Sequence, residues 1–331
     1  MNLLELTDHG LFCPPAGIFI DPWRPVDKAV VTHAHADHAR RGMSHYLAHE
    51  QSKEVMKLRL GSDISIQTLE YGEGIQLQGV QLSLHPAGHI PGSAQVRLEY
   101  QGKVAVVSGD YKVEEDGIAT PFEPIKCHEF VSECTFGLPI YSWEPQSKVF
   151  DEINAWWKAN ASQGFNTIIF AYSLGKAQRI LQHLDPSQGE IFVHGSIWST
   201  NQALLANGLA LREVPKVSQD IPKSRYQGAL ILAPPAAMGT PWMSKFAPYR
   251  TGNCSGWMQV RGIRRRRSVD RGFVLSDHAD WKGLVAAIEA TQAEKVYLTH
   301  GSTDSFEKFL QEEKHIDAVA LQTLFGEEEN E

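Results

Sequence analysis

One short segment restricts the folds open to this chain more than any other feature. The sequence VVTHAHADHAR places His33, His35, Asp37 and His38 within six residues. Neutral imidazole and carboxylate groups are the side chains that bind Zn²⁺ and Mn²⁺. The apolar residues before the histidines read as a strand, in which alternate side chains share one face. We therefore expect His33 and His35 side by side at a strand end, with Asp37 and His38 at the turn into a helix.

Three further predicted strand ends carry the same kinds of side chain. His89 lies in HPAGHIPGS, Asp110 in VAVVSGDYK and His300 in KVYLTHG. In each case a strand is followed by a possible ligand and then by a turn. Together with the first segment they can supply two divalent cations, Zn²⁺ first and Mn²⁺ as the alternative. A polar loop that happens to contain histidines accounts poorly for an HxHxDH string.

The order of predicted elements divides the chain into parts. Up to about residue 110 the sequence reads as short strands and turns, with one helix at SKEVMKLRLG. From about residue 139 helices and strands alternate, which favours a parallel sheet covered by helices. From Phe273 onward, GFVLSDHADWKGLVAAIEATQAEKVYLTHG predicts strand, helix and strand. A chain of 331 residues can form two domains or one large α/β unit.

Composition excludes several classes of protein. The net charge of −8 argues against a histone-like nucleic-acid binder, although a local basic surface is compatible with it. The four cysteines show no CxxC spacing, which indicates neither a zinc ribbon nor a disulfide framework and fits a reducing cytosol. There is no signal-peptide pattern and no apolar run of about 18 residues that could span a membrane. We therefore expect a cytoplasmic protein that does not associate with membranes.

The motifs together resemble a known superfamily. HxHxDH, AGH, SGD and the late THG are similar to the metal-binding motifs of the metallo-β-lactamase superfamily. FVSECTFG, LSDHAD and YLTHG resemble the three additional motifs of its β-CASP nucleases. Within that group, the length and the wording AGHIPGSAQV most resemble bacterial exonucleases associated with ATP-dependent DNA ligases.

The resemblance implies an α/β fold and a set of ligands. The fold would be a metallo-β-lactamase αββα sandwich, formed by residues 1–138 and 268–331, with a β-CASP domain of parallel sheet and helices inserted at 139–267. Carried over position by position, one metal ion would be held by His33, His35 and His89. The other would be held by Asp37, His38 and His300, and Asp110 would bridge the two.

The resemblance also implies catalytic residues, which are Asp37, Glu133 and His278. Asp37 acts as a metal ligand. His278 would protonate the leaving group, and Glu133 would orient its ring. The alternatives are an eighth ligand or a structural histidine for His278, and a helix-terminal or surface carboxylate for Glu133. Cys134 stands where the family usually has serine, and we expect this exchange to leave the chemistry intact with the loss of a hydroxyl contact.

Two segments are candidates for binding phosphates of a nucleic acid. Backbone amides at a helix start bind phosphate well, which suggests Ser173 and Lys176 in AYSLGKAQRIL. An arginine run, which could contact the backbone of a nucleic acid, comprises Arg264, Arg265, Arg266 and Arg267. The alternatives are an ordinary strand–helix turn for the first and a solvated charged face for the second.

The leading hypothesis is a two-metal-dependent nuclease, a DNA exonuclease of DNA repair that is linked to an ATP-dependent DNA ligase and to a helicase. Single-stranded DNA is favoured over RNA. An RNA-processing nuclease is the alternative, because a histidine such as His300 in the third motif is usual for the RNA-cleaving branch. A small-molecule metallohydrolase is a rival of another class, against which the insert and the arginine run argue. An inactive binding module is disfavoured because all seven ligand positions are filled.

Overall fold

The computed structural model describes residues 3–262 and 269–323 of the chain. The chain divides into two compact units, with boundaries after Ser142 and after Asp277. The first unit combines the two ends of the chain, and the second unit is the segment between them. The sequence predicts the insert at 139–267, whereas the second unit extends ten residues further. The reason is that β16 (Arg271–Phe273) pairs with β15 (Tyr249–Cys254) of the second unit.

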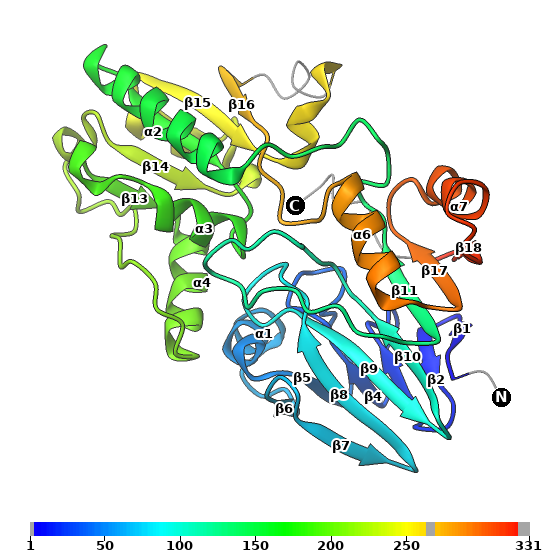
Figure 1. The fold of residues 1–331 in the computed structure, drawn as a ribbon. Coiled ribbons are helices and arrows are strands. Elements are labelled where there is room, and N and C mark those ends of the chain that lie inside the picture. The colour runs from blue at the N-terminus through cyan, green and yellow to red at the C-terminus, as the bar shows by residue number, and fades with distance from the viewer. Residues whose placement is uncertain (1–2, 263–268, 324–331) are drawn as a thin grey trace. The chain divides into compact units, whose positions relative to one another are not determined.

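Two β-sheets form the centre of the first unit (Figure 1). Six strands form the first sheet in chain order, and seven strands form the second in the order β18-β17-β11-β10-β9-β8-β7. The strands of the first sheet are β1 (Glu5–Thr7), β2 (Gly10–Cys13), β3 (Ile18–Ile20), β4 (Lys28–Val30), β5 (His45–His49) and β6 (Ile66–Leu69). Those of the second are β7 (Gly74–Leu77), β8 (Val80–Pro86), β9 (Ala94–Tyr100), β10 (Lys103–Val107), β11 (Glu129–Glu133), β17 (Lys295–Thr299) and β18 (Ala318–Ala320).

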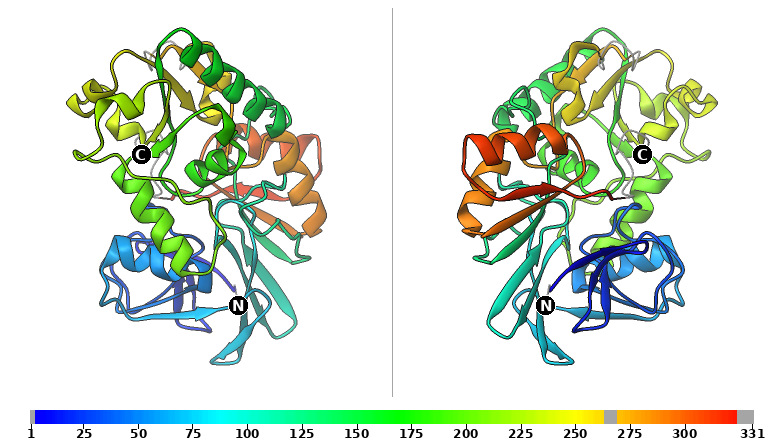
Figure 2. Two further views of the ribbon diagram at one scale, coloured as in Figure 1. Left: turned by 90° about the vertical axis from the view of Figure 1, so that its left-hand side faces the viewer. Right: turned by 90° about the vertical axis from the view of Figure 1, so that its right-hand side faces the viewer.

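The two sheets lie face to face over one apolar core (Figure 2). Because strand side chains alternate between faces, residues such as Leu82 point into this core while their neighbours point outward. The outer face of the seven-stranded sheet, with Phe130 at its centre, packs against α6 (Trp281–Thr291) and α7 (Thr303–Glu312). A third helix, α1 (Lys53–Leu60), lies beside the six-stranded sheet. These layers confirm the predicted αββα sandwich.

Several strands end at one edge of the seven-stranded sheet, which determines where polar loop residues meet. Strands β10, β11 and β17 run parallel, so their carboxyl ends are adjacent. Asp110 follows β10, Glu133 ends β11 and His300 follows β17. The loop between β8 and β9, which carries His89, lies at the same edge because β9 runs antiparallel to β10. Segments far apart in the sequence therefore deliver their polar side chains to one place.

Five parallel strands form the sheet of the second unit, in the order β13-β14-β12-β15-β16 (Figure 1). Its other strands and its helices are β12 (Asn166–Phe170), β13 (Ile191–Val193), β14 (Leu230–Ala233), α2 (Gln146–Ser162), α3 (Lys176–His183) and α4 (Gly195–Ala206). The helices pack against the sheet and form one apolar core with it. A second apolar core forms where short segments that contain Tyr226 and Phe246 pack against strand residues. This arrangement confirms the predicted parallel sheet with helices. Within the described residues, no helix combines the length and apolar character that a bilayer crossing requires.

Candidate metal centre and active site

The HxHxDH segment forms an irregular loop after β4. The backbone N–H of Val31 still donates to the carbonyl of Leu47 in the neighbouring strand. The next N–H, that of Thr32, donates instead to the Asp21 carboxylate at 2.8 Å, and the Thr32 hydroxyl donates to the same carboxylate at 2.6 Å. The expectation of histidines on a strand, followed by a helix, is therefore wrong. The buried Asp21 carboxylate accepts the backbone N–H that would otherwise bond to a neighbouring strand, so the strand does not continue.

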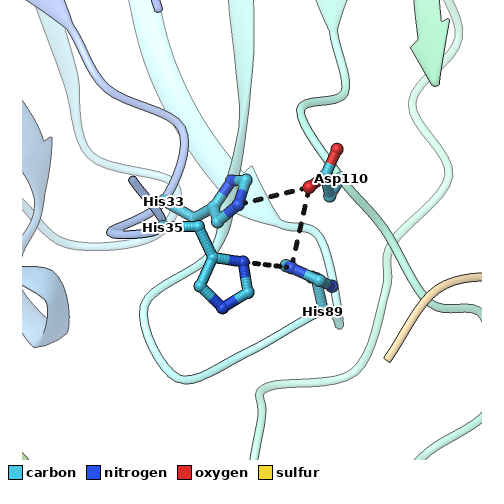
Figure 3. Close-up of side chains that lie close together, drawn as sticks. All are labelled: His33, His35, His89 and Asp110. Atoms are coloured by element: carbon cyan, nitrogen blue, oxygen red, sulfur yellow. Dashed lines mark hydrogen bonds and ion pairs between the residues drawn. The ribbon is translucent and has the colours of Figure 1, made fainter. Parts of the chain in front are cut away.

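Four buried side chains from three loops form the first ligand group (Figure 3). One ligand atom from each of His33, His35, His89 and Asp110 lies within 4.8 Å of all the others. The Nε2 atom of His89 is 3.1 Å from Nδ1 of His35 and 3.8 Å from Oδ2 of Asp110. Three ring nitrogens and one carboxylate thus converge on one point, and all four side chains are buried.

The second ligand group shares a residue with the first. Ligand atoms of Asp37, His38 and His300 also lie within 4.8 Å of one another. The Nε2 atom of His38 is 3.5 Å from Oδ2 of Asp37 and 3.4 Å from Oδ2 of Asp110. The same Asp110 oxygen is 3.3 Å from Nε2 of His33 in the first group. Asp110 therefore adjoins both groups, which is the position that a bridging ligand requires.

An unusual backbone conformation presents His300. Its φ angle is +58°, in the left-handed region that side chains rarely adopt. The Cys134 thiol donates to the His300 carbonyl at 2.9 Å, and the Cys134 N–H donates to the Thr299 carbonyl at 2.8 Å. Gly301 follows with φ +67°, and a Cβ at that position would collide with the Cys134 carbonyl oxygen. The turn thus holds His300 against the end of β11, and the thiol supplies one of its hydrogen bonds.

Burial and neighbouring charges shift the acidity of the central residues. Burial holds the pKa of His33 well below its ordinary value, and the adjacent His38 adds to this effect. Burial alone would also lower the pKa of His38, but the carboxylates of Asp37, Asp110 and Asp21 raise it well above the ordinary value. For Asp110, burial alone would raise the pKa, but the neighbouring His38 and His33 together hold it well below the ordinary value. A cation that binds beside His38 must therefore displace a proton.

The chemistry of these side chains fits two divalent cations. Five imidazoles and two carboxylates supply nitrogen and oxygen ligands of the kind that Zn²⁺ and Mn²⁺ accept. Asp110 Oδ1 is buried and accepts no hydrogen bond from any residue that the structure describes. A buried carboxylate oxygen without a partner is costly, and a cation would relieve that cost.

A second polar pair lies next to the first ligand group. The Nδ1 atom of His278 is 2.8 Å from Oε1 of Glu133, and both side chains are buried. Glu133 also accepts the N–H of Tyr111 at 3.0 Å and that of Thr135 at 3.2 Å, which fixes both of its oxygens. The His278 ring lies 4.6 Å from the His89 ring, centroid to centroid. A carboxylate that is itself held rigidly therefore holds this histidine beside the ligands.

No family model matches the chain, but curated proteins do. It is 29% identical over 306 residues, 92% of its length, to a probable DNA ligase of Opitutus terrae. It is 27% identical over 141 residues, 42% of its length, to endoribonuclease YSH1 of Candida albicans. It is 28% identical over 189 residues, 49% of its length, to ribonuclease TTHA0252 of Thermus thermophilus. These similarities support the resemblance of the chain to the β-CASP group of the metallo-β-lactamase superfamily.

The chain spans less than half the length of these relatives. The matches cover 30% of the ligase, 15% of the endoribonuclease and 43% of the ribonuclease. A crystal structure of a protein of unknown function from Enterococcus faecalis V583 has a TM-score of 0.60 with this chain. The superposition covers 88% of this chain and 78% of that protein at 10% sequence identity, so the likeness is one of fold alone.

The residues proposed to contact phosphate belong to the second unit. Ser173 Oγ lies 3.0 Å from Ser196 Oγ in an exposed contact. Lys176 is buried, and its Nζ is 3.1 Å from Oδ2 of Asp277, so its charge is already balanced within the unit. Four predicted contacts lie outside the described residues, namely Arg264, Arg265, Arg266 and Arg267. Phosphate binding by all six stays a prediction.

Sequence reasoning missed Asp21, the carboxylate in the first unit that orients the candidate ligand His38. Asp21 Oδ2 lies 2.7 Å from His38 Nδ1, which directs the opposite nitrogen toward the ligand cluster. A signal is present in the sequence, because Asp21 follows the apolar run GIFI much as Asp110 follows the apolar run VAVV. The sequence also indicates no role for two buried charged residues of the second unit, Arg179 and Asp277.

Proposed function

We propose that this protein is a nuclease that hydrolyses phosphodiester bonds with two divalent cations. The observation that carries the proposal is the convergence of seven histidine and aspartate side chains into two groups around Asp110, beside the His278–Glu133 pair. Two cations held there would supply an activated water and would neutralise charge on the phosphodiester oxygens. His33, His35 and His89 would hold one cation, and Asp37, His38 and His300 the other.

The proton that the leaving oxygen needs would come from His278. The Glu133 carboxylate keeps a proton on Nδ1 and favours the charged ring, so Nε2 is the atom that would donate. Because Glu133 is fixed by two backbone N–H groups, the direction of that donation is set before any substrate binds. The role of Glu133 is thus orientation and electrostatic support.

A polymeric, negatively charged substrate is supported by the charge of the second unit. Its sequence, residues 143–277, contains 16 lysines and arginines against nine aspartates and glutamates, a net charge of +7. The rest of the chain contains 15 against 30, a net charge of −15. Such segregation favours a nucleic acid over a small ester, since basic side chains bind the phosphate backbone.

Within nucleic acids we propose single-stranded DNA, cleaved by an exonuclease that acts in repair together with an ATP-dependent DNA ligase. The supporting observation is that the similarity to the probable DNA ligase extends over 92% of this chain, whereas the ribonucleases match 42% and 49%. RNA is the second candidate because two of these relatives are named ribonucleases. We favour Zn²⁺ over Mn²⁺ because five of the seven ligands are imidazoles.

The test combines two substrates with a matched pair of variants. Purified protein is incubated with end-labelled single-stranded DNA and RNA of the same sequence, with Zn²⁺ or Mn²⁺. We expect DNA cleavage that is lost in His35→Ala and retained in His45→Ala, which removes an exposed histidine of the same unit. Cleavage of RNA alone would replace DNA by RNA in the proposal. No cleavage of either, with two cations bound, would contradict a nuclease and point to small esters.

A further inference from the structure

A buried ionic network joins helix α3 to the residues that precede His278. The Asp277 carboxylate is 3.1 Å from Lys176 Nζ through Oδ2 and 2.7 Å from Arg179 Nη2 through Oδ1. The same Arg179 nitrogen donates to the Ser276 carbonyl at 2.7 Å. The Lys176, Arg179 and Asp277 side chains are only 5%, 1% and 2% exposed. All four residues belong to the second unit.

Holding two chain segments together with this network costs free energy of desolvation. Burying three charged groups carries a desolvation cost, and well-packed apolar side chains often stabilise such a position equally well. Ion pairs and guanidinium hydrogen bonds are directional, however, and they fix the position of their partners more narrowly than apolar packing does. What the network supplies is therefore a defined location for Ser276 and Asp277.

That location matters because the next residue is His278. The boundary between the two units falls at the Asp277–His278 peptide bond. On the other side of that bond, His278 pairs with Glu133, the Ala279 N–H donates to the Tyr111 carbonyl at 2.8 Å, and Asp280 caps helix α6. The five residues from 276 to 280 therefore all have defined contacts, and those of Ser276 and Asp277 include the Lys176 and Arg179 side chains of α3.

We propose that Lys176 and Arg179 are positioning residues, which act through Asp277 to place His278 for proton donation. The inference rests on the proposed nuclease function, because it assigns these residues to the step in which His278 protonates the leaving oxygen. It also gives Lys176 a different role from the phosphate contact that its helix-start position suggests. In this role neither the Lys176 nor the Arg179 side chain needs to touch the substrate.

The test uses a substrate whose leaving group needs no proton. Oligonucleotides carry sulfur in place of one bridging oxygen, at the 3′ or the 5′ position, so that the scissile bond releases a thiolate. His278→Ala is the reference, and it should lose about 100-fold or more in kcat on the oxygen substrate but far less on the sulfur substrate. Asp277→Asn and Arg179→Met should lose about 10- to 100-fold on oxygen, with KM nearly unchanged, and less than about 3-fold on sulfur.

Controls separate positioning from general damage. Glu190→Gln breaks an exposed ion pair with Arg225 in the same unit and should leave both substrates unaffected. Arg179→Lys keeps the charge but not the planar guanidinium group, and it should restore part of the kcat that Arg179→Met loses. It also serves as the test variant if Arg179→Met does not fold. Bound metal should equal the wild-type amount in every variant.

A spectroscopic signature gives a readout that does not depend on turnover. The Nδ1–H of His278 bonded to Glu133 should give a downfield proton resonance, assigned by its absence in His278→Ala. We expect this resonance to shift or broaden in Arg179→Lys and Asp277→Asn but not in Glu190→Gln.

Each outcome separates the inference from the function on which it rests. Equal losses on oxygen and sulfur in Asp277→Asn, with selective rescue of His278→Ala, would overturn the positioning role and leave the nuclease proposal intact. A raised Kd for DNA with unchanged kcat in Lys176→Met would also overturn it, in favour of phosphate binding. Equal losses in His278→Ala itself would contradict the proposed acid and the inference together.

Discussion

Asp21 offers a sharp test of how the metal centre is held. Its buried carboxylate accepts both donors of Thr32, and Oδ2 lies 2.7 Å from His38 Nδ1. With its proton on Nδ1, His38 presents Nε2 as the donor atom for a cation. The substitution Asp21→Asn preserves the shape of the side chain but places an NH₂ group where one oxygen was.

The expected effect follows from the hydrogen bonds that remain. Since Oδ1 continues to accept the Thr32 N–H, the new amide nitrogen faces His38 Nδ1. That contact is satisfied only if the His38 proton moves to Nε2, which blocks the metal-binding atom. Loss of such an orienting partner lowers metal affinity about 10- to 100-fold, which is about 1.4–2.7 kcal/mol. The lower affinity should affect the cation that Asp37, His38 and His300 are proposed to hold.

The assay is a titration of metal-free protein with Zn²⁺ in competition with a chromogenic chelator. Wild type should bind two equivalents, and Asp21→Asn should bind one as before and one weakly. Asp116→Asn is the matched control, because Asp116 is another buried carboxylate of the same unit that accepts backbone N–H groups. Two equivalents of wild-type affinity in Asp21→Asn, or equal weakening of both, would refute the reasoning.

Three further changes should have defined outcomes. Glu133→Gln removes the charge that supports the proposed acid and should lower kcat about 100-fold with unchanged metal content, and full activity in a steady-state cleavage assay would contradict that role. Gly301→Ala places a Cβ against the Cys134 carbonyl at φ +67° and should lower the free energy of unfolding by about 3 kcal/mol, which urea denaturation measures; wild-type stability would be inconsistent with the turn. Burial lowers the pKa of His49 to about 4 in the folded protein. As the pH falls, His49 therefore takes up a proton in the unfolded chain at a higher pH than in the folded protein. This difference lowers the free energy of unfolding; the effect is absent above pH 6.5 and grows down to about pH 4. His49→Asn should abolish about 2–3 kcal/mol of that decrease, and an unchanged pH dependence in urea titrations would show that burial of His49 is not its cause.

The fold class and the grouping of the seven candidate ligands could be predicted from the sequence for one physical reason. Asp110 and His300 each follow a short apolar strand, and parallel strands of one sheet end at a common edge. A polar residue after such a strand therefore comes close to its counterparts whatever the length of chain between them. The motif resemblance depends on the same local form, so the two arguments agree.

The local course of the chain could not be predicted in the same way. Alternation of apolar residues indicates that the strand continues into the histidines, but it does not reveal that the Asp21 carboxylate takes the Thr32 N–H. For a similar reason, the sequence predicts that the insert ends at residue 267, whereas the second unit ends at Asp277. Pairing of β16 with β15 rests on a partner strand rather than on a pattern within residues 268–277.

Lys176 shows most clearly how a distant partner changes the meaning of a local pattern. A lysine at a helix start after a glycine loop is a reasonable phosphate contact while its surroundings are unknown. Asp277, from a remote part of the sequence, neutralises that lysine inside the protein, and Arg179 adds a second cation on the same carboxylate. A phosphate at this loop would have to compete with Asp277 for Lys176, or else bind the exposed hydroxyl groups of Ser173 and Ser196. The same arrangement that makes Lys176 a poor phosphate ligand makes it a suitable anchor for the residue before His278.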